Sequence, residues 1–199
     1  DYIGSRGLGD VYKRQLISLL CLVSRDTGIT LINPPMKVID NFLPDDVFAN
    51  IYKAIIEQNL NWSFVNYVAF VDEKKEAWNY FYSHMVYDTD RPYSTLYDVM
   101  LPFVEQVHTV KPLRSCMRIM VNAYPHTPEL KTHQKHTDFD FTHKGAILYL
   151  NTCDGYTWCQ GEKVYSVANR VLLHDPSIPH YSTTTTTDHR RVIINLNYM

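Results

Sequence analysis

The sequence lacks the features that mark membrane, disulfide-rich and nucleic-acid-binding proteins. No apolar run approaches the roughly 18 residues that a membrane span needs. The four cysteines (Cys21, Cys116, Cys153 and Cys159) form no CxxC pair and no dense framework, which favours free thiols in a reducing compartment. The formal net charge is only −2 and no dense Lys/Arg block occurs, so bulk electrostatics indicate neither a nucleic-acid nor an anionic-membrane partner. A cytoplasmic location is therefore expected.

What is present is a chain of 199 residues, 45% of them hydrophobic, which is enough for one domain with a core. Residues 1–35 are expected to be a disordered, non-native segment. The stretch Ser5–Gln15 resembles a translated sequencing adapter, and Met36 is the first methionine of the chain. A competing interpretation is a signal peptide, since basic residues precede the short apolar stretch Leu16–Val23. Under the adapter hypothesis, residues 1–35 are translated from the adapter and other upstream sequence, and residues 36–199 form one domain.

The first part of this domain, residues 36–112, is predicted to be a helical support packed on a sheet. Asp45 and Asp46 precede apolar residues at helical spacing, as expected where a helix begins. A second helix is expected after Leu96, and Pro102 should kink or split it. Strands are expected at residues 37–42, 62–70 and 78–86.

From residue 113 the pattern is mostly β, because short apolar runs are separated by Gly, Pro and Asp turn signals. A polar loop is expected at residues 127–140, and the run Thr183–Thr187 is expected to be a flexible turn. Residues 113–199 are therefore predicted to form the catalytic core. Its expected strands lie at residues 116–124, 145–151, 156–159, 163–166, 170–174 and 191–198. Together these patterns predict a mainly β fold with flanking helices (α+β), whose core is a β-sandwich or jelly roll.

Residues with metal-binding chemistry concentrate in the last third of the chain. His136 and Asp138 form an HxD triplet in the polar loop, and His180 follows a turn that ends in Pro179. Two imidazoles and one carboxylate can occupy one face of an octahedral metal and leave three positions open, which is the facial triad of non-haem Fe(II) oxygenases. An HxD triplet alone is a weak signal, because a single loop histidine is more often solvated. The prediction of a metal site therefore rests on the ordered set.

His174 competes with His180 for the place of the third ligand. It lies in an apolar strand before the turn, where a core or buried polar role is the simpler interpretation, so His180 is preferred. Several other histidines have no comparable partner pattern and are assigned surface or packing roles: His84, His108, His126, His133 and His143.

Arg191 opens the last predicted strand, at a distance along the chain that can bring it beside the metal. A guanidinium can hold the distal carboxylate of an organic co-substrate with two hydrogen bonds. Side chains alternate along a strand, so an inward Arg191 places Asn195 and Asn197 on the inner face and Arg190 on the outer one. A cavity lined by one arginine and two asparagines suits a dicarboxylate. The alternative for Arg191 is a solvated charge at the start of the strand.

The segments that carry a family resemblance, in order, are Val121–Pro125, His136–Asp138, Ile147–Asn151, Asp154–Thr157, Ala168–Asp175, Ile178–His180 and Arg190–Asn197. This series resembles the 2-oxoglutarate- and Fe(II)-dependent dioxygenases of the prolyl 4-hydroxylase-like group, especially the small members found in viral and environmental sequences. The resemblance covers residues 36–199 and is strongest after Leu113. Two positions depart from the family pattern: Asp154-Gly155 replaces a Gly-Gly pair, and His174 replaces an apolar residue.

The resemblance implies a double-stranded β-helix (jelly-roll) core and an enzyme that hydroxylates an unactivated C–H bond, possibly that of a prolyl or other peptide side chain. Fe(II) would be held by His136, Asp138 and His180, and 2-oxoglutarate by Arg191, with O2 as the second co-substrate and ascorbate as a possible reductant. Succinate and CO2 would be released. Further residues implied at the co-substrate pocket are Tyr149 and Tyr124, beside the Asn195 predicted from strand alternation. For both tyrosines, a core aromatic role is the alternative.

Two other classes of function remain open at this point. A catalytically silent jelly-roll module, with a structural or binding role, would explain the fold but not the ordered His-Asp-His-Arg set. A zinc hydrolase could use the same three ligands, yet it lacks a clear general base and leaves Arg191 unexplained. The substrate itself, whether a peptide or a small molecule, is not specified by these residues. A viral source would make the host cytoplasm the expected location.

Overall fold

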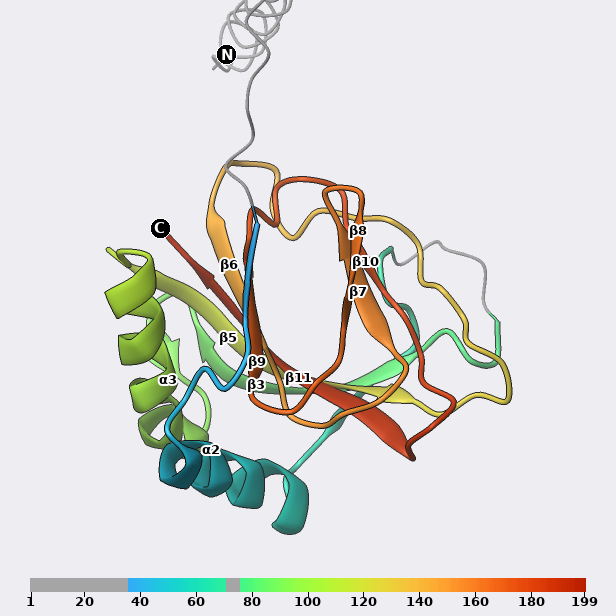
Figure 1. Cartoon of the computed structure of the whole chain (residues 1–199), viewed down its shortest axis with the longest axis horizontal. Helices are drawn as coiled ribbons and strands as arrows, with labels where there is room; N and C mark the ends of the chain where they lie inside the picture. The colour runs from blue at the N-terminus through green and yellow to red at the C-terminus, as the bar shows by residue number, and fades with distance from the viewer. Residues whose placement is uncertain (1–35, 71–75) are drawn as a thin grey trace, which may run out of the picture. The chain divides into compact units, whose positions relative to one another are not determined.

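The computed structural model describes residues 36–70 and 76–199, so the prediction about residues 1–35 lies outside the described residues (Figure 1). The helical elements are α2 (Asp45–Tyr52), the π-helical turn η1 (Lys53–Glu57) and α3 (Leu96–Val110). The strands are β1 (Lys37–Ile39), β2 (Ser63–Val65), β3 (Phe81–Asp88), β4 (Arg91–Pro92), β5 (Cys116–Pro125), β6 (Lys144–Tyr149), β7 (Tyr156–Cys159), β8 (Glu162–Tyr165), β9 (Arg170–His174), β10 (Tyr181–Ser182) and β11 (Arg190–Tyr198). The mainly β fold with flanking helices is confirmed.

Two antiparallel sheets form the core. The main sheet has the strand order β1-β9-β6-β11-β5-β3-β2, with β4 paired to β3, and the smaller sheet has the order β10-β7-β8. Because β1 pairs with β9 and β3 pairs with β5, the region predicted as a helical support also supplies strands to the main sheet. The loop after β5 lies antiparallel to the segment around β10, through bridges that pair Thr132 with Thr183 and His136 with His180. The jelly-roll prediction agrees with this two-sheet arrangement.

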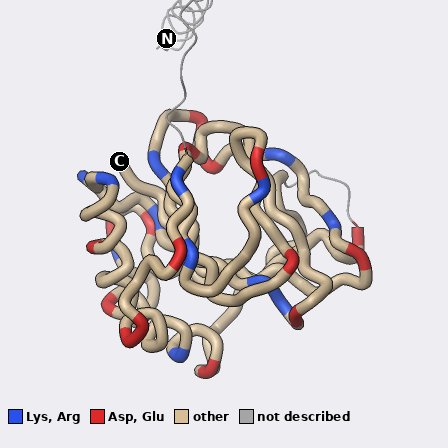
Figure 2. Tube along the Cα trace, viewed as in Figure 1, with Lys and Arg blue, Asp and Glu red and all other residues tan. Residues whose placement is uncertain are grey.

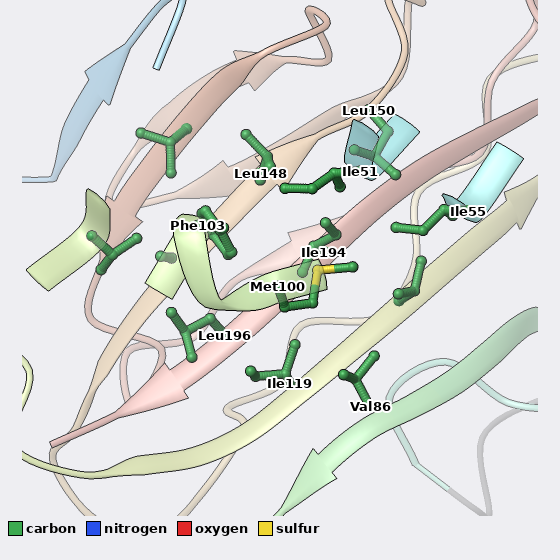
Figure 3. Close-up of a cluster of buried hydrophobic side chains, with 14 of the residues drawn as sticks. Ile51, Ile55, Val86, Met100, Phe103, Ile119, Leu148, Leu150, Ile194 and Leu196 are labelled. Atoms are coloured by element: carbon green, nitrogen blue, oxygen red, sulfur yellow. The ribbon is translucent and has the colours of Figure 1, made fainter. Parts of the chain in front are cut away.

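The helices and the smaller sheet lie on opposite sides of the main sheet (Figure 1). In α3, the buried residues Leu96, Met100, Phe103 and Val107 recur at intervals of three and four, which places them on one face of the helix. This face packs on the outer side of the main sheet, where Figure 3 shows side chains from both helical segments meeting those of the strands. Among the buried residues of this cluster are Ile51, Ile55, Val86, Ile119, Leu148, Leu150, Ile194 and Leu196.

A second apolar cluster lies between the two sheets. The main sheet contributes Tyr149 and Ile193, and the smaller sheet contributes Cys159 and Val164. Along β11 the side chains therefore divide as strand alternation predicts: Val192, Ile194 and Leu196 belong to the outer cluster and Ile193 to the inner one. The inner side of β11 also carries the polar residues Arg191, Asn195 and Asn197, all of them buried.

Three local expectations differ from the structure. The strands expected at residues 62–70 and 37–42 are limited to Ser63–Val65 and Lys37–Ile39, and the one expected at residues 78–86 begins only at Phe81. Pro102 does not split α3, which runs continuously from Leu96 to Val110. Because Pro102 lies on the exposed side of the helix, water can satisfy the carbonyl group that loses its N–H partner.

The third difference concerns Thr183–Thr187, which is not a flexible turn. Thr183, Thr184 and Thr185 are fully buried, and the backbone N–H of Thr184 donates to the carbonyl of Lys131 at 3.0 Å. The side chain of Asp154 accepts hydrogen bonds from Thr185 Oγ1 at 2.8 Å, Thr186 Oγ1 at 2.6 Å and Thr187 Oγ1 at 3.2 Å. The run is ordered because one carboxylate and a neighbouring loop satisfy its polar groups.

Charged residues are spread over the described chain, with Lys and Arg interspersed among Asp and Glu (Figure 2). No helix in residues 36–70 and 76–199 combines the length and apolar character needed to cross a membrane. The cysteines within these ranges are free thiols: Cys116, Cys153 and Cys159. The expectation of free thiols is confirmed for these residues.

Candidate metal centre

His136 and His180 are direct partners across an antiparallel bridge. The backbone N–H of each residue donates to the carbonyl of the other, and both N–O distances are 2.9 Å. Paired residues of this kind project their side chains to the same side of the ladder. The two imidazole rings accordingly face each other, with centroids 4.7 Å apart.

Asp138 completes a compact group with these two histidines. Its backbone N–H donates to the carbonyl of Pro176 at 3.0 Å, which ties this loop to the turn that leads to His180. Asp138 Oδ1 lies 3.8 Å from His136 Nε2 and 3.5 Å from His180 Nε2. One potential ligand atom from each residue lies within 4.8 Å of the others, so the group could hold a metal ion.

The hydrogen bonds of the two rings favour metal-binding tautomers. His136 Nδ1 lies 3.2 Å from the carbonyl oxygen of Gln134, and His180 Nδ1 lies 3.0 Å from that of Ile178. A carbonyl group only accepts, so each Nδ1 carries a hydrogen, and Nε2 is the nitrogen of each ring that is left to bind a metal once it carries no proton. Outer partners of this type fix ring orientation in metal sites.

The electrostatics keep Asp138 ionised. Burial alone would raise the pKa of its carboxyl group, but the hydrogen bond and charge of His180, the charge of Arg118 and a hydrogen bond from Asn197 outweigh it and hold the pKa well below its usual range. Burial acts to lower the pKa of His180, and the neighbouring Asp138 reverses this and raises it. The group therefore offers a permanent anionic oxygen between two imidazoles.

A cavity of about 320 Å³ opens beside the three residues. It is lined by the loop after β2, by the inner faces of β3, β5 and β11, and by Thr157 and Tyr181 of the smaller sheet. Among its described lining residues, Asp138 is the only carboxylate and Arg118 the only lysine or arginine. Tyr124, Ile147 and Asn195 also line it, so the cavity extends from the candidate metal group along the space between the sheets.

Arg191 is completely buried and is not itself among the residues that line this cavity, but it contacts two that are, Thr157 and Tyr124. Its Nη2 donates to Thr157 Oγ1 at 2.8 Å, and its guanidinium carbon lies 5.4 Å from the ring centroids of both Tyr124 and Tyr149. Its Nε and Nη1 atoms are buried without a hydrogen-bond partner. A buried cation with unsatisfied donors is costly, so this position is suited to an anion that brings its own acceptors.

Tyr149 and Tyr124 flank the guanidinium as neutral phenols. Burial raises the pKa of Tyr149 to about 12, against the opposing charge of Arg191, and burial likewise raises the pKa of Tyr124. The Tyr149 hydroxyl donates a long hydrogen bond of 3.4 Å to the carbonyl of Val164 and also interacts with Thr157 and Arg191. Both hydroxyl groups therefore retain a proton that they could donate to a carboxylate.

The remaining predicted residues lie in two different places. Asn195 lines the cavity as expected, but its Nδ2 donates to Asp138 Oδ2 at 3.2 Å, at the metal end of the space. His174 is not in the candidate metal group. Its ring centroid lies 5.2 Å from that of His180, both of its ring nitrogens are buried without a hydrogen-bond partner, and burial lowers its pKa to about 3.

Sequence reasoning missed several supporting residues. Arg118, which lies 3.4 Å from Asp138, gave no motif signal, and Thr157, which holds Arg191, appeared only as the end of the segment Asp154–Thr157, without a role. Gly155 was noted only as part of an altered Gly-Gly pair. A Cβ atom at Gly155 would lie 2.5 Å from Arg191 Cδ and 2.7 Å from the carbonyl oxygen of Thr184, so only glycine leaves room for the arginine. Strand alternation predicted Asn197 as part of the lining of a dicarboxylate cavity, but it is not among the lining residues and donates to Asp138 instead.

Comparison with known proteins places this arrangement in a recognised fold. No protein-family model matches the chain, and no curated protein matches it by sequence. Solved structures do match. A prolyl hydroxylase from Trichoplax adhaerens, in complex with a hypoxia inducible factor oxygen degradation domain peptide fragment, has a TM-score of 0.56 and 15% identity, over 98% of this chain and 94% of that one.

Two bacterial structures give the same result. A Pseudomonas putida prolyl-4-hydroxylase has a TM-score of 0.52 and 15% identity, over 82% of this chain and 91% of that one. An oxidoreductase of the 2OG-Fe(II) oxygenase family from Burkholderia pseudomallei has a TM-score of 0.56 and 12% identity, over 82% of this chain and 84% of that one. At these identities the likeness establishes the fold. The predicted resemblance to the prolyl 4-hydroxylase-like group is thus confirmed at the level of architecture.

Proposed function

We propose that the chain is an Fe(II)- and 2-oxoglutarate-dependent dioxygenase that hydroxylates an unactivated C–H bond. The fold it shares with 2OG-Fe(II) oxygenases supports this proposal but does not carry it, because one fold hosts many functions. The observation that carries it is the combination of a His-Asp-His group with a buried Arg191 that has unsatisfied donors and contacts Thr157 and Tyr124, both of which line the cavity beside that group.

The donor set fits a resident Fe(II). Two imidazole nitrogens and one carboxylate oxygen are ligands of intermediate and hard character, and the two-histidine, one-carboxylate set is the one that non-haem Fe(II) oxygenases use. His136, Asp138 and His180 would hold the ion, through Asp138 Oδ1 and the two Nε2 atoms that lie 3.8 and 3.5 Å from it. The cavity beside the group leaves space for further ligands.

The surroundings of Arg191 fit the distal carboxylate of 2-oxoglutarate. The free Nε and Nη1 atoms of Arg191 can donate two hydrogen bonds to a distal carboxylate, and the neutral hydroxyls of Tyr149 and Tyr124 can add to them. Thr157 holds the remaining nitrogen, Nη2, and so orients the guanidinium plane. An apolar lining that includes Ile147 and Ile193 would keep water away from the carbon chain of the co-substrate.

Fe(II) and 2-oxoglutarate, when bound with O2, supply an oxidant strong enough to cleave an unactivated C–H bond, with release of succinate and CO2. The protein's own contribution is to hold the ligands in place, to orient the co-substrate through Arg191 and to exclude water. We propose a peptide side chain, prolyl by preference, as the substrate, since one structural neighbour is in complex with a peptide fragment. Ascorbate as a reductant and a cytoplasmic location stay predictions.

The hydrolase and silent-module alternatives are less well supported. A zinc hydrolase needs a general base beside the metal-bound water, and Asp138 is the only carboxylate among the described residues that line the cavity. A silent module would have no reason to retain a buried, unpaired Arg191.

Calorimetric titration of 2-oxoglutarate into the Mn(II)-loaded protein under nitrogen tests the proposal. We expect saturable binding, and an Arg191→Met variant should bind on the order of 100-fold more weakly, because it loses two charge-assisted hydrogen bonds of about 1.5 kcal/mol each. Arg190→Met is the matched control, because Arg190 is exposed at the other face of the same strand. Equal binding by the Arg191→Met variant, or no binding by metal-loaded wild-type protein, would overturn the assignment.

A further inference from the structure

The carboxylate of Asp138 is supported on the side away from the histidines. While Oδ1 faces the two imidazoles, Oδ2 accepts a hydrogen bond from Asn197 Nδ2 at 2.7 Å and a longer one from Asn195 Nδ2 at 3.2 Å. Arg118 Nη2 lies 3.4 Å from the same Oδ2 atom. The two oxygens of one carboxylate thus have separate environments, one toward the imidazoles and one toward nitrogen donors.

Asn197 is the centre of this support, and its whole hydrogen-bonding capacity is used. Its Oδ1 accepts from Arg118 Nε at 3.2 Å and from Arg118 Nη2 at 3.1 Å. Its Nδ2 donates to Asp138 Oδ2 and also lies 3.2 Å from His143 Nε2. His143 Nδ1 lies 2.9 Å from the carbonyl oxygen of Phe141, which leaves Nε2 as an acceptor for the second amide hydrogen.

This pattern determines which way the amide points. A flipped Asn197 would place its carbonyl oxygen against the Asp138 carboxylate and its amino group against the Arg118 guanidinium, and both contacts would be repulsive. Arg118 therefore acts on the carboxylate in two ways: directly, through its charge 3.4 Å from Oδ2, and indirectly, by holding Asn197. Arg118 is itself held above the ring of Phe139, with its guanidinium carbon 4.9 Å from the ring centroid.

We propose that Asn197 and Arg118 are positioning residues that keep Asp138 a one-oxygen metal ligand, with Oδ1 presented to the ion and Oδ2 retained by the amide. The inference rests on the metal site of the proposed function, but it does not depend on which reaction that site performs. A carboxylate that binds through one oxygen leaves a coordination position for other ligands, whereas a two-oxygen mode would fill it.

The support follows from the register of the main sheet. Asn197 of β11 pairs directly with Arg118 of β5, and six residues earlier in β11 Arg191 pairs with Tyr124 of the same strand β5. Both pairs lie on the inner face, one at the metal end of the cavity and the other at the proposed co-substrate end. A single strand pairing therefore positions both the metal carboxylate and the anion-binding arginine.

Mn(II) affinity, measured from the electron paramagnetic resonance signal of free Mn(II), tests this inference without any turnover. The Asn197→Leu variant should bind Mn(II) 10- to 100-fold more weakly than wild type, the usual range for loss of an outer partner of a ligand. The visible spectrum of the Co(II)-loaded protein should also change, because the coordination of Asp138 changes. Asn79→Leu is the control: Asn79 is a buried asparagine outside the described lining of the cavity, so the Mn(II) affinity of this variant should stay within about twofold of wild type.

If the Asn197→Leu variant does not fold, variants of Arg118 test the same inference. Arg118→Met should weaken Mn(II) binding by freeing the Asn197 amide, and Arg118→Lys should restore part of it, because an ammonium group can still donate to Asn197 Oδ1. Wild-type affinity and an unchanged Co(II) spectrum in either Asn197→Leu or Arg118→Met would overturn the inference and leave the dioxygenase proposal intact. Failure of the wild-type protein to bind Mn(II) would overturn both.

Discussion

Replacing Arg191 with methionine should change the stability of the metal-free protein far less than its complete burial suggests. The lost contacts are the hydrogen bond to Thr157, about 1.5–3 kcal/mol for a charged donor, and the interactions with the Tyr124 and Tyr149 rings, about 0.5–2 kcal/mol each. This loss is offset because the variant no longer buries two unsatisfied N–H groups, each of which destabilises the folded wild-type protein by about 1–3 kcal/mol. The two sums are similar, so we expect a change in unfolding free energy within about 2 kcal/mol of zero.

Urea unfolding of metal-free wild type, Arg191→Met and the control Arg190→Met measures this change. The same experiment with metal and 2-oxoglutarate should separate the variants, because a ligand at 100 times its dissociation constant stabilises the native state by about 2.7 kcal/mol. Wild type and Arg190→Met should gain this stabilisation and Arg191→Met should not. The reasoning would be refuted if Arg191→Met lost 4 kcal/mol or more without ligand, since that loss would mean that Arg191 is paired within the protein.

Further predictions concern residues around the two ends of the cavity. His174→Leu removes two unsatisfied ring nitrogens and should stabilise the protein by about 1–3 kcal/mol at pH 7.5 without loss of Mn(II) affinity; weakened Mn(II) binding would instead identify His174 as a ligand. The folded pKa values of His133 and His174 are both about 3, below the unfolded value of 6.5, so wild-type stability should be fully present above pH 6.5 and fall as the pH drops below it. His174→Leu should reduce that slope by at most about 1.4 kcal/mol per pH unit, and equal slopes by urea titration would contradict this account. Asp154→Ala should destabilise the fold by about 2–4 kcal/mol in thermal unfolding near neutral pH, because several charge-assisted hydrogen bonds are lost, and an unchanged midpoint would show that they contribute little. Gly155→Ala should weaken 2-oxoglutarate binding by displacing Arg191 while leaving Mn(II) affinity unchanged, which calorimetry can check.

The general fold could be predicted from local strand and turn patterns, and the members of the candidate site from their order along the chain. Strand alternation along residues 191–197 was enough to place Arg191, Asn195 and Asn197 on one face, and the structure has them there. The order of His136, Asp138 and His180 between predicted strands was enough to expect them together, and their ligand atoms lie within 4.8 Å of one another. Their roles as iron ligands stay a proposal.

The supporting residues could not be predicted because their partners are set by strand register and not by spacing. Arg118 donates to Asn197, which lies 79 positions away in the chain, and no sequence pattern links Thr157 to Arg191. The error over Thr183–Thr187 has the same origin. A run of threonines has no apolar pattern, yet Asp154 and the loop before His136 satisfy its polar groups and allow its burial. Long-range polar pairing of this kind is not encoded in local periodicity.

The most direct test of the proposed chemistry is the visible absorption spectrum of the anaerobic Fe(II)-loaded protein as 2-oxoglutarate is added. The proposal predicts a weak metal-to-ligand charge-transfer band, absent from His136→Ala and weakened in Arg191→Met at the same co-substrate concentration. A folded wild-type protein that binds Fe(II) in full but shows no band with saturating 2-oxoglutarate would contradict it.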